Sequence, residues 1–269
     1  MKLKVTLIAV GISAAFSFAS LGLTRGAGSN PLDTQENTTP TSHQPSVISG
    51  GEPTTIQEGV MTEKQREHSK LFKGYAGEVT RGKKLSQLVG ERGDLRIVRY
   101  PGTLIVPRSV NLNDFLQKLA CEADAVVIGA VKAKSSHIAE EGAFLFTDYD
   151  LTVEEILKNT SQAPIQPADE ITVTRTGGSV KLNGHKISTV DLAQKPLEIG
   201  TRYLLFLRLI PTTGAYKSLN DKYYDNSFKL TGSNITQVSD LLFPFGPNGT
   251  ASAVTFLAQV RSAIGNCGN

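Results

Sequence analysis

Three acidic residues alternate along one apolar segment in the middle of the sequence and are the first candidates for chemistry. Asp148 and Asp150 lie in "FLFTDYDLTVEEILK", and Glu154 follows. Successive side chains of a strand point to opposite faces, so these acids share one face while Leu151 and Val153 share the core face. Such a row could bind calcium, although calcium sites usually recruit loop carbonyls. The pattern favours a solvated outer face of a sheet, with a calcium site as the alternative.

Two histidines are the candidates for acid–base or zinc chemistry. His137 lies between two predicted strands, and His185 lies beside a predicted hairpin turn. Neither has a second histidine at a ligand spacing, and zinc needs three or four ligands. The common signatures of exported hydrolases, G-x-S-x-G, S-x-x-K and H-E-x-x-H, are absent. We therefore interpret both histidines as exposed loop residues and expect no catalytic residue and no cofactor.

The sequence has only two cysteines, Cys121 and Cys267, and each follows or ends a predicted helix. Two cysteines in an exported chain usually pair. The alternative is that Cys121 is a nucleophile assisted by His137, but the neighbouring Glu122 and Asp124 would raise the pKa of its thiol. The sequence therefore favours a structural disulfide between Cys121 and Cys267.

The N-terminal residues indicate the compartment. Lys2 and Lys4 precede an apolar run that ends at Leu23, so residues 1–24 are predicted to be a signal peptide or an uncleaved membrane anchor. Residues 25–60 are rich in Gly, Ser, Asn, Pro, Thr and Gln and are expected to form a disordered tether. The rest is expected to be extracytoplasmic: secreted, periplasmic or anchored by this segment.

The charge distribution argues against a nucleic-acid partner. The whole chain carries a net charge of +3, and removal of Lys2 and Lys4 leaves 3 − 2 = +1. The remaining basic residues are dispersed among acidic ones, unlike a phosphate-binding stripe. The stretch "GEVTRGKK" nearly matches a phosphate-binding loop, but Lys84 replaces the required hydroxyl residue. We interpret this stretch as a basic turn before a helix.

The helices and strands that must position these residues can be predicted from helix-capping residues and from the spacing of apolar residues. Residues 61–110 are expected to form a small annex that begins with a helix capped by Thr62. Residues 111–269 are expected to form the main domain, from a helix capped by Asn111 to a last helix over residues 252–264. The predicted strands between these helices are residues 123–131, 144–158, 169–175, 179–190 and 202–210.

Three residues have predicted structural roles within these strands. Gly129 interrupts an apolar strand, where a strongly bent barrel strand often needs a residue without Cβ. Asn183 and Gly184 suit a two-residue hairpin turn that needs positive φ at both positions.

The order of four segments carries a family resemblance. Over residues 121–209, "ADAVVIGAV", "YDLTVEEILK", "DEITVTR" and "PLEIGTRYLLFL" together resemble the netrin-like module shared with tissue inhibitors of metalloproteinases. The resemblance implies an OB-type barrel of five or more strands between an N-terminal and a C-terminal helix, and a binding or inhibitory role. Such inhibitors chelate the protease metal through an N-terminal cysteine, whereas residues 1–120 precede Cys121. The resemblance is therefore carried over for the fold alone.

These observations predict a mainly β, exported, non-enzymatic module that binds a protein or a cell-envelope component. Membrane contact is expected only through the N-terminal segment. The alternative is an exported hydrolase or metal-binding protein of unfamiliar type that uses His137, Asp148, Asp150 or His185.

Overall fold

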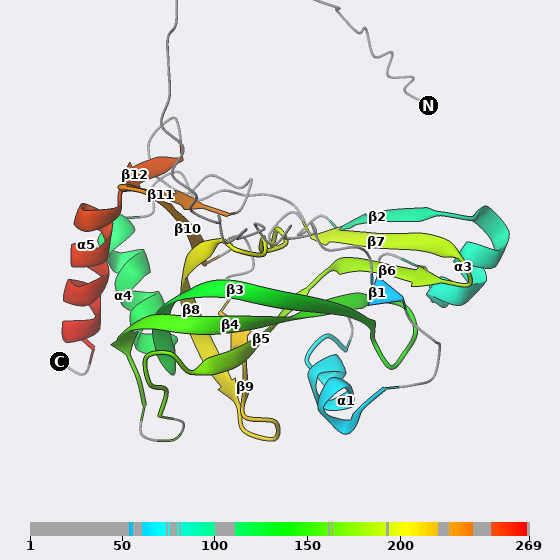
Figure 1. Ribbon diagram of the computed structural model, residues 1–269, viewed down its shortest axis with the longest axis horizontal. Helices are drawn as coiled ribbons and strands as arrows, with labels where there is room; N and C mark the ends of the chain where they lie inside the picture. Colours follow the sequence, from blue (N-terminus) through cyan, green and yellow to red (C-terminus); the bar gives the residue numbers. More distant parts are fainter. Residues whose placement is uncertain are drawn as a thin grey trace, which may run out of the picture. The chain divides into compact units, whose positions relative to one another are not determined.

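The protein is mainly β in the computed structural model shown in Figure 1. The structure describes residues 54–55, 61–73, 75, 80, 82–99, 111–160, 162, 164–191, 194–219, 226–238 and 249–267. The signal peptide or anchor expected over residues 1–24 and nearly all of the expected tether lie outside the described residues. Within the described ranges, no helix combines the length and the apolar content that crossing a membrane requires.

The largest element is an eight-stranded sheet, in the order β12-β11-β10-β8-β3-β4-β5-β9. Its strands are β3 (Ala125–Ile138), β4 (Leu145–Lys158), β5 (Glu170–Thr176), β8 (Arg202–Ile210), β9 (Ala215–Ser218), β10 (Ser227–Thr231), β11 (Asn234–Gln237) and β12 (Thr250–Ser252). Strand β9 also pairs with β8, so the hydrogen bonds run in a ring through β3, β4, β5, β9 and β8. Only the β5–β9 contact of this ring is parallel.

A second sheet has four strands in the order β1-β6-β7-β2. They are β1 (Thr54–Thr55), β2 (Leu95–Arg99), β6 (Gly178–Leu182) and β7 (His185–Asp191). Asn183 and Gly184 form the turn between β6 and β7 with φ angles of 51° and 82°, the positive values that this turn was predicted to need. Strand β2 pairs in parallel with β7, so the segment expected as an annex completes this sheet.

The interior of the ring follows the predicted alternation of β4. Tyr149, Leu151 and Val153 are buried in one apolar cluster with Val127 and Leu205 from the neighbouring strands. Burial of such side chains contributes roughly 1.5–3 kcal/mol each, which makes this cluster a principal source of stability.

Gly129 lies at an irregularity in the pairing of β3 with β4. The pairing shifts register between Ile128 and Gly129. A Cβ at Gly129 would lie 3.0 Å from the carbonyl oxygen of Thr152, so a larger side chain would force the two backbones apart.

Helices α4 (Leu112–Glu122) and α5 (Ala253–Gly265) lie side by side and share an apolar cluster with one face of β3, β8 and β10 (Figure 1). Phe115 and Leu116 from α4 contact this cluster, as do Phe256 and Val260 from α5. Both helices begin as predicted, after Asn111 and Ser252.

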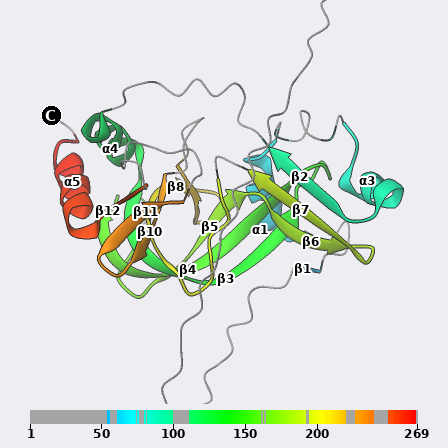
Figure 2. The ribbon, with the colours of Figure 1, turned by 90° about the horizontal axis from the view of Figure 1, so that it is seen from above.

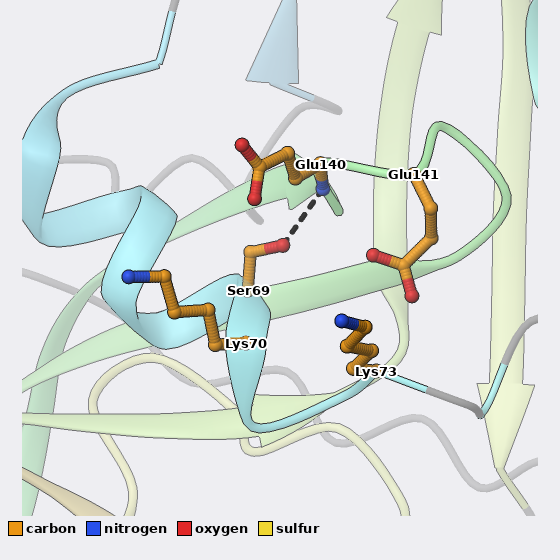
Figure 3. A pocket seen from close by; sticks show the side chains of 5 residues that line it. All are labelled: Ser69, Lys70, Lys73, Glu140 and Glu141. Atoms are coloured by element: carbon orange, nitrogen blue, oxygen red, sulfur yellow. Dashed lines mark hydrogen bonds between the residues drawn. The ribbon is translucent and has the colours of Figure 1, made fainter.

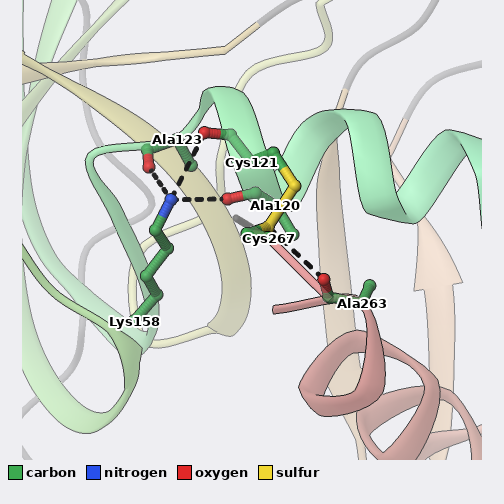
Figure 4. The surroundings of a disulfide bond; sticks show 6 residues. All are labelled: Ala120, Cys121, Ala123, Lys158, Ala263 and Cys267. Atoms are coloured by element: carbon green, nitrogen blue, oxygen red, sulfur yellow. Dashed lines mark hydrogen bonds between the residues drawn. A yellow bond between two sulfur atoms is a disulfide. The ribbon is translucent and has the colours of Figure 1, made fainter. Parts of the chain in front are cut away.

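The predicted disulfide joins Cys121 at the end of α4 to Cys267 just after α5 (Figure 4). Nearby, the Lys158 ammonium donates hydrogen bonds to the carbonyl oxygens of Ala120 and Ala123, at 2.8 and 2.6 Å. A cation at this position satisfies carbonyl groups that the helix end leaves without a partner.

The remaining helices are α1 (Glu63–Lys70) and α3 (Leu85–Arg92). In Figures 1 and 2, α1 lies against the β3–β4 hairpin, away from the end that α4 and α5 cover. Helix α3 begins after Lys84, as expected for the basic turn.

Candidate functional site

Among the described residues, a cluster of reactive side chains forms where α1 lies against β4. His68 of α1 is fully buried, and its Nδ1 lies 2.9 and 3.0 Å from the two carboxylate oxygens of Asp148. Its Nε2 lies 3.0 Å from the hydroxyl of Thr213, in the turn between β8 and β9. The imidazole therefore joins three segments that are far apart in sequence.

The local sequence explains why α1 presents His68 to the sheet. Thr62 and Gln65 form the predicted capping box, with hydrogen bonds of 3.3 and 2.9 Å, so the helix starts at a defined residue. Phe72 lies just past the C-cap of α1, and it contacts the same strand, β4, as His68 does. Phe72 stacks on Phe146 of β4, with ring centroids 5.5 Å apart.

His137 approaches the same carboxylate from β3. Its Nε2 lies 3.7 Å from Asp148 Oδ2, which is too long for a hydrogen bond and becomes an ion pair only when the imidazole is protonated. Its ring lies beside Phe146, with centroids 5.2 Å apart. Burial lowers the pKa of His137 most strongly; Asp148 acts in the opposite direction, and His68 lowers the pKa further.

The structure corrects two expectations at this site. Strand β3 extends to Ile138, so His137 is a strand residue, and only 12% of its side chain is exposed. The Asp148 side chain is also only 12% exposed, because α1 covers this part of β4, where a solvated face was expected. The sequence alternation placed Asp148 on the correct face but could not show what lies over that face.

A cavity of about 330 Å³ opens beside the cluster. It is lined by Ser69, Lys70, Lys73, Glu140 and Glu141, which come from the end of α1 and from the loop between β3 and β4 (Figure 3). The Ser69 hydroxyl accepts a hydrogen bond of 2.7 Å from the backbone N–H of Glu140. The lining carries charges of both signs, which suits a polar ligand or peptide better than an apolar one.

The other sequence candidates lie elsewhere. Asp150 is exposed and accepts a hydrogen bond of 3.1 Å from Thr172, and Glu154 forms an ion pair of 2.6 Å with Arg202. His185 is 48% exposed and lies 3.4 Å from Asp94 at the hairpin turn. In the part of the chain that the structure describes, no group of three or more His, Cys, Asp or Glu residues is arranged to hold a metal ion.

The side chains of Thr213, His68 and Asp148 form a hydrogen-bonded row of a hydroxyl, an imidazole and a carboxylate. When the Nδ1–H of His68 donates to Asp148, its Nε2 accepts from the Thr213 hydroxyl, as in the triads of hydrolases. The row equally ties α1 to the sheet and to the β8–β9 turn. The full burial of His68 favours this structural role, because a general base must exchange protons with bound substrate and water.

Sequence reasoning missed His68 and Thr213. The capping box followed by a histidine and a phenylalanine four residues apart was the available signal for His68. Nothing in the turn "IPTTGA" distinguished Thr213 from its neighbour Thr212.

Comparison with known proteins adds no assignment. No family model matches the chain, and no curated protein matches it. The function must therefore be argued from the geometry of the site.

Proposed function

We propose that the protein is an exported, non-enzymatic module that binds a protein or a cell-envelope component, built on an OB-type barrel of the netrin-like kind. The ring of five strands, with one parallel contact between β5 and β9, supports the barrel. Helices α4 and α5 then correspond to the flanking helices that the resemblance implies. The disulfide supports export, because disulfides persist in oxidising compartments.

The observation that carries the binding role is where the site lies on the ring. OB barrels bind ligands on the face of their second and third strands and with the loops that follow the first and fourth strands. In this ring, these parts are β4, β5, the loop over residues 139–144 and the turn over residues 211–214. The buried His68 cluster and the charged cavity both lie there. This face therefore combines largely buried polar groups with a charged hollow beside them.

The test is capture of the partner by the full chain, purified with its disulfide intact and incubated with the envelope and secreted fractions of its source. Captured partners are crosslinked, and the crosslinked residues are identified by mass spectrometry. Crosslinks on β4, β5 and the turn over residues 211–214 are expected.

Variants define the surface in this test. Thr172→Lys adds a bulky charge at a half-buried position of β5 that contacts Lys64 of α1, and Lys181→Glu at an exposed position of β6 in the other sheet is the control. Thr172→Lys should reduce capture and Lys181→Glu should not. Equal capture by both variants, with crosslinks away from β4 and β5, would contradict the proposal.

One observation favours a hydrolase as the second candidate, namely the row Thr213, His68, Asp148. In that case the Thr213 hydroxyl would attack an activated ester, His68 would take its proton, and the alcohol would leave. Incubation with p-nitrophenyl acetate tests this candidate. An acetyl group on Thr213, absent in Thr213→Val and retained on the residue in Thr213→Ser, would favour the hydrolase over the binding module.

A further inference from the structure

The eight residues of α1 contact the sheet through polar groups, whereas its flanks make the apolar contacts, with Phe72 in a cluster with Phe144 and Phe146. Only His68 and Ser69 of the helix are buried, and both make hydrogen bonds to other segments. The Lys64 ammonium adds a hydrogen bond of 3.0 Å to the Thr172 hydroxyl on β5. A helix of eight residues is not stable by itself in water, so α1 depends on these contacts and on Phe72. Hydrogen bonds of this kind can be exchanged for bonds to water or to another peptide.

The surface beneath α1 combines a carboxylate with aromatic rings. Its members are Phe144, Phe146, Asp148, His137 and Thr174, which we call the covered face. Phe144 and Phe146 are at most 1% exposed and contact Phe72. Large aromatic side chains in a desolvated surface are enriched in binding hot spots, and a nearby carboxylate favours a partner that can also donate a hydrogen bond.

One member of the covered face lacks a partner. Thr174 lies directly opposite Asp148 in the β4–β5 pairing, so the two side chains point to the same side of the sheet. The Thr174 hydroxyl is buried, and it has no hydrogen-bond partner among the described residues. A buried hydroxyl without a partner loses its hydration and gains nothing in return. Helix α1 therefore satisfies this surface incompletely, and an occupant with one more polar group would fit it better.

We propose that α1 masks an interaction surface, and that a protein partner displaces it by docking a helix on the covered face. This inference rests on the proposed binding function and names its site. The partner helix carries an imidazole and an aromatic side chain one turn apart, in the places of His68 and Phe72, and a polar side chain that reaches Thr174. Recognition of an amphipathic helix in a groove is a common mode of peptide binding.

A synthetic peptide tests this proposal without knowledge of the natural partner. The probe is fluorescein-labelled TEKQREHSKLFK, residues 62–73 of this chain. In the unmodified chain, the attached α1 competes at an effective concentration in the millimolar range. In the full chain with His68→Ala and Phe72→Ala, which we call the opened variant, α1 loses its contacts with Asp148, Thr213 and Phe146, so the covered face should become accessible. The peptide should bind this variant at least tenfold more tightly than it binds the unmodified chain, as measured by fluorescence anisotropy.

Two controls make the test specific. A peptide with His68→Ala and Phe72→Ala should bind the opened variant at least tenfold more weakly than the native peptide. Adding Asp148→Asn to the opened variant should weaken binding of the native peptide to a similar extent. Equal binding of the native peptide to all three proteins, or equal binding of both peptides, would overturn the proposal.

A second measurement covers the case in which the opened variant does not fold. Amide hydrogen exchange of the unmodified chain compares residues 63–72 with α4 in the same molecule. Faster exchange in α1, by tenfold or more, is expected of a displaceable helix. Protection of α1 equal to that of α4 would overturn the proposal.

The peptide assay and the partner capture fail independently. If the peptide binds the opened variant but no partner is captured, α1 does cover a peptide-binding surface, and the proposed binding function fails. If a partner is captured and the native peptide does not compete with it, the binding function stands and the site assigned here is wrong.

Discussion

The two ends of the β3–β4 hairpin are covered by helices that are held by opposite means. At one end, α4 and α5 bury aromatic and aliphatic side chains in a shared cluster, and a disulfide joins them. At the other end, α1 itself contributes hydrogen bonds centred on His68, and only the smaller apolar cluster around the flanking Phe72 accompanies them, with no disulfide. Apolar burial and a covalent bond give a permanent attachment, whereas each hydrogen bond contributes a net of only about 0.5–1.5 kcal/mol. The first end can therefore serve as scaffold and the second as a region that changes.

The largest predicted effect concerns the permanent end. Replacing Cys121 and Cys267 by Ser should lower the free energy of unfolding by about 5 kcal/mol, because the bond closes a long loop in the unfolded chain. Urea unfolding of the double variant against the oxidised chain measures this effect. A loss below about 1 kcal/mol would mean that the apolar cluster alone fixes α4 and α5.

The second prediction compares one phenylalanine from each end. Phe256 is 1% exposed in the α4–α5 cluster, and Phe72 is 7% exposed over β4. Phe256→Ala should cost about 3–5 kcal/mol in global stability, as expected for a large core truncation. Phe72→Ala removes similar volume but should mainly speed hydrogen exchange in α1, because that end opens locally.

Urea unfolding and hydrogen exchange of the two variants measure these effects. Equal losses of global stability would remove the distinction between the two ends.

The elements that local patterns define could be predicted from the sequence. Thr62, Asn111 and Ser252 each precede a helix, as the capping and periodicity signals indicated. The inward side chains of β4, including Leu151 and Val153, followed the period of two. The pairing of the two cysteines followed from their number and the expected compartment.

What the sequence could not show depends on contacts between distant segments. The burial of Asp148 results from α1, whose His68 is 80 residues away. Strand β9 closes the ring with only four residues, too short for a periodic signal. The hairpin of β6 and β7 has a clear turn signal, but its partner β2 lies about 90 residues earlier, and nothing local indicates that pairing. Local sequence patterns therefore specify the helices and strands, whereas contacts between distant segments decide which acidic residues are exposed.

The third prediction uses pH to test the polar end. Burial lowers the pKa of His137 below its ordinary value of 6.5, so the unfolded chain takes up this proton at a higher pH than the folded chain. Stability is therefore complete above pH 6.5 and falls with acidification until the pH reaches the folded-state pKa. Each unit between the two pKa values is worth about 1.4 kcal/mol.

Thermal melts between pH 5 and 7.5 measure this effect. His137→Gln should flatten the profile. His185→Gln is the control, because His185 is exposed; this variant should leave the pH profile unchanged. An unchanged slope in His137→Gln would show that the acid sensitivity arises elsewhere.

The smallest predicted effect separates the two aspartates of β4. Asp150→Asn should change the free energy of unfolding by less than about 0.5 kcal/mol, because the carboxylate is exposed and the amide can still accept the hydrogen bond from Thr172. In the native chain both carboxylate oxygens of Asp148 contact the buried Nδ1 of His68. Asp148→Asn keeps the shape of the side chain but replaces one of these acceptor oxygens with a donor amide. It should therefore cost more than Asp150→Asn, and hydrogen exchange should increase chiefly in α1. If urea unfolding gives equal small losses for both variants and α1 exchange is unchanged, the His68–Asp148 contact does not hold α1. The contrast between the two ends of the hairpin then fails at β4, which carries both aspartates on one face.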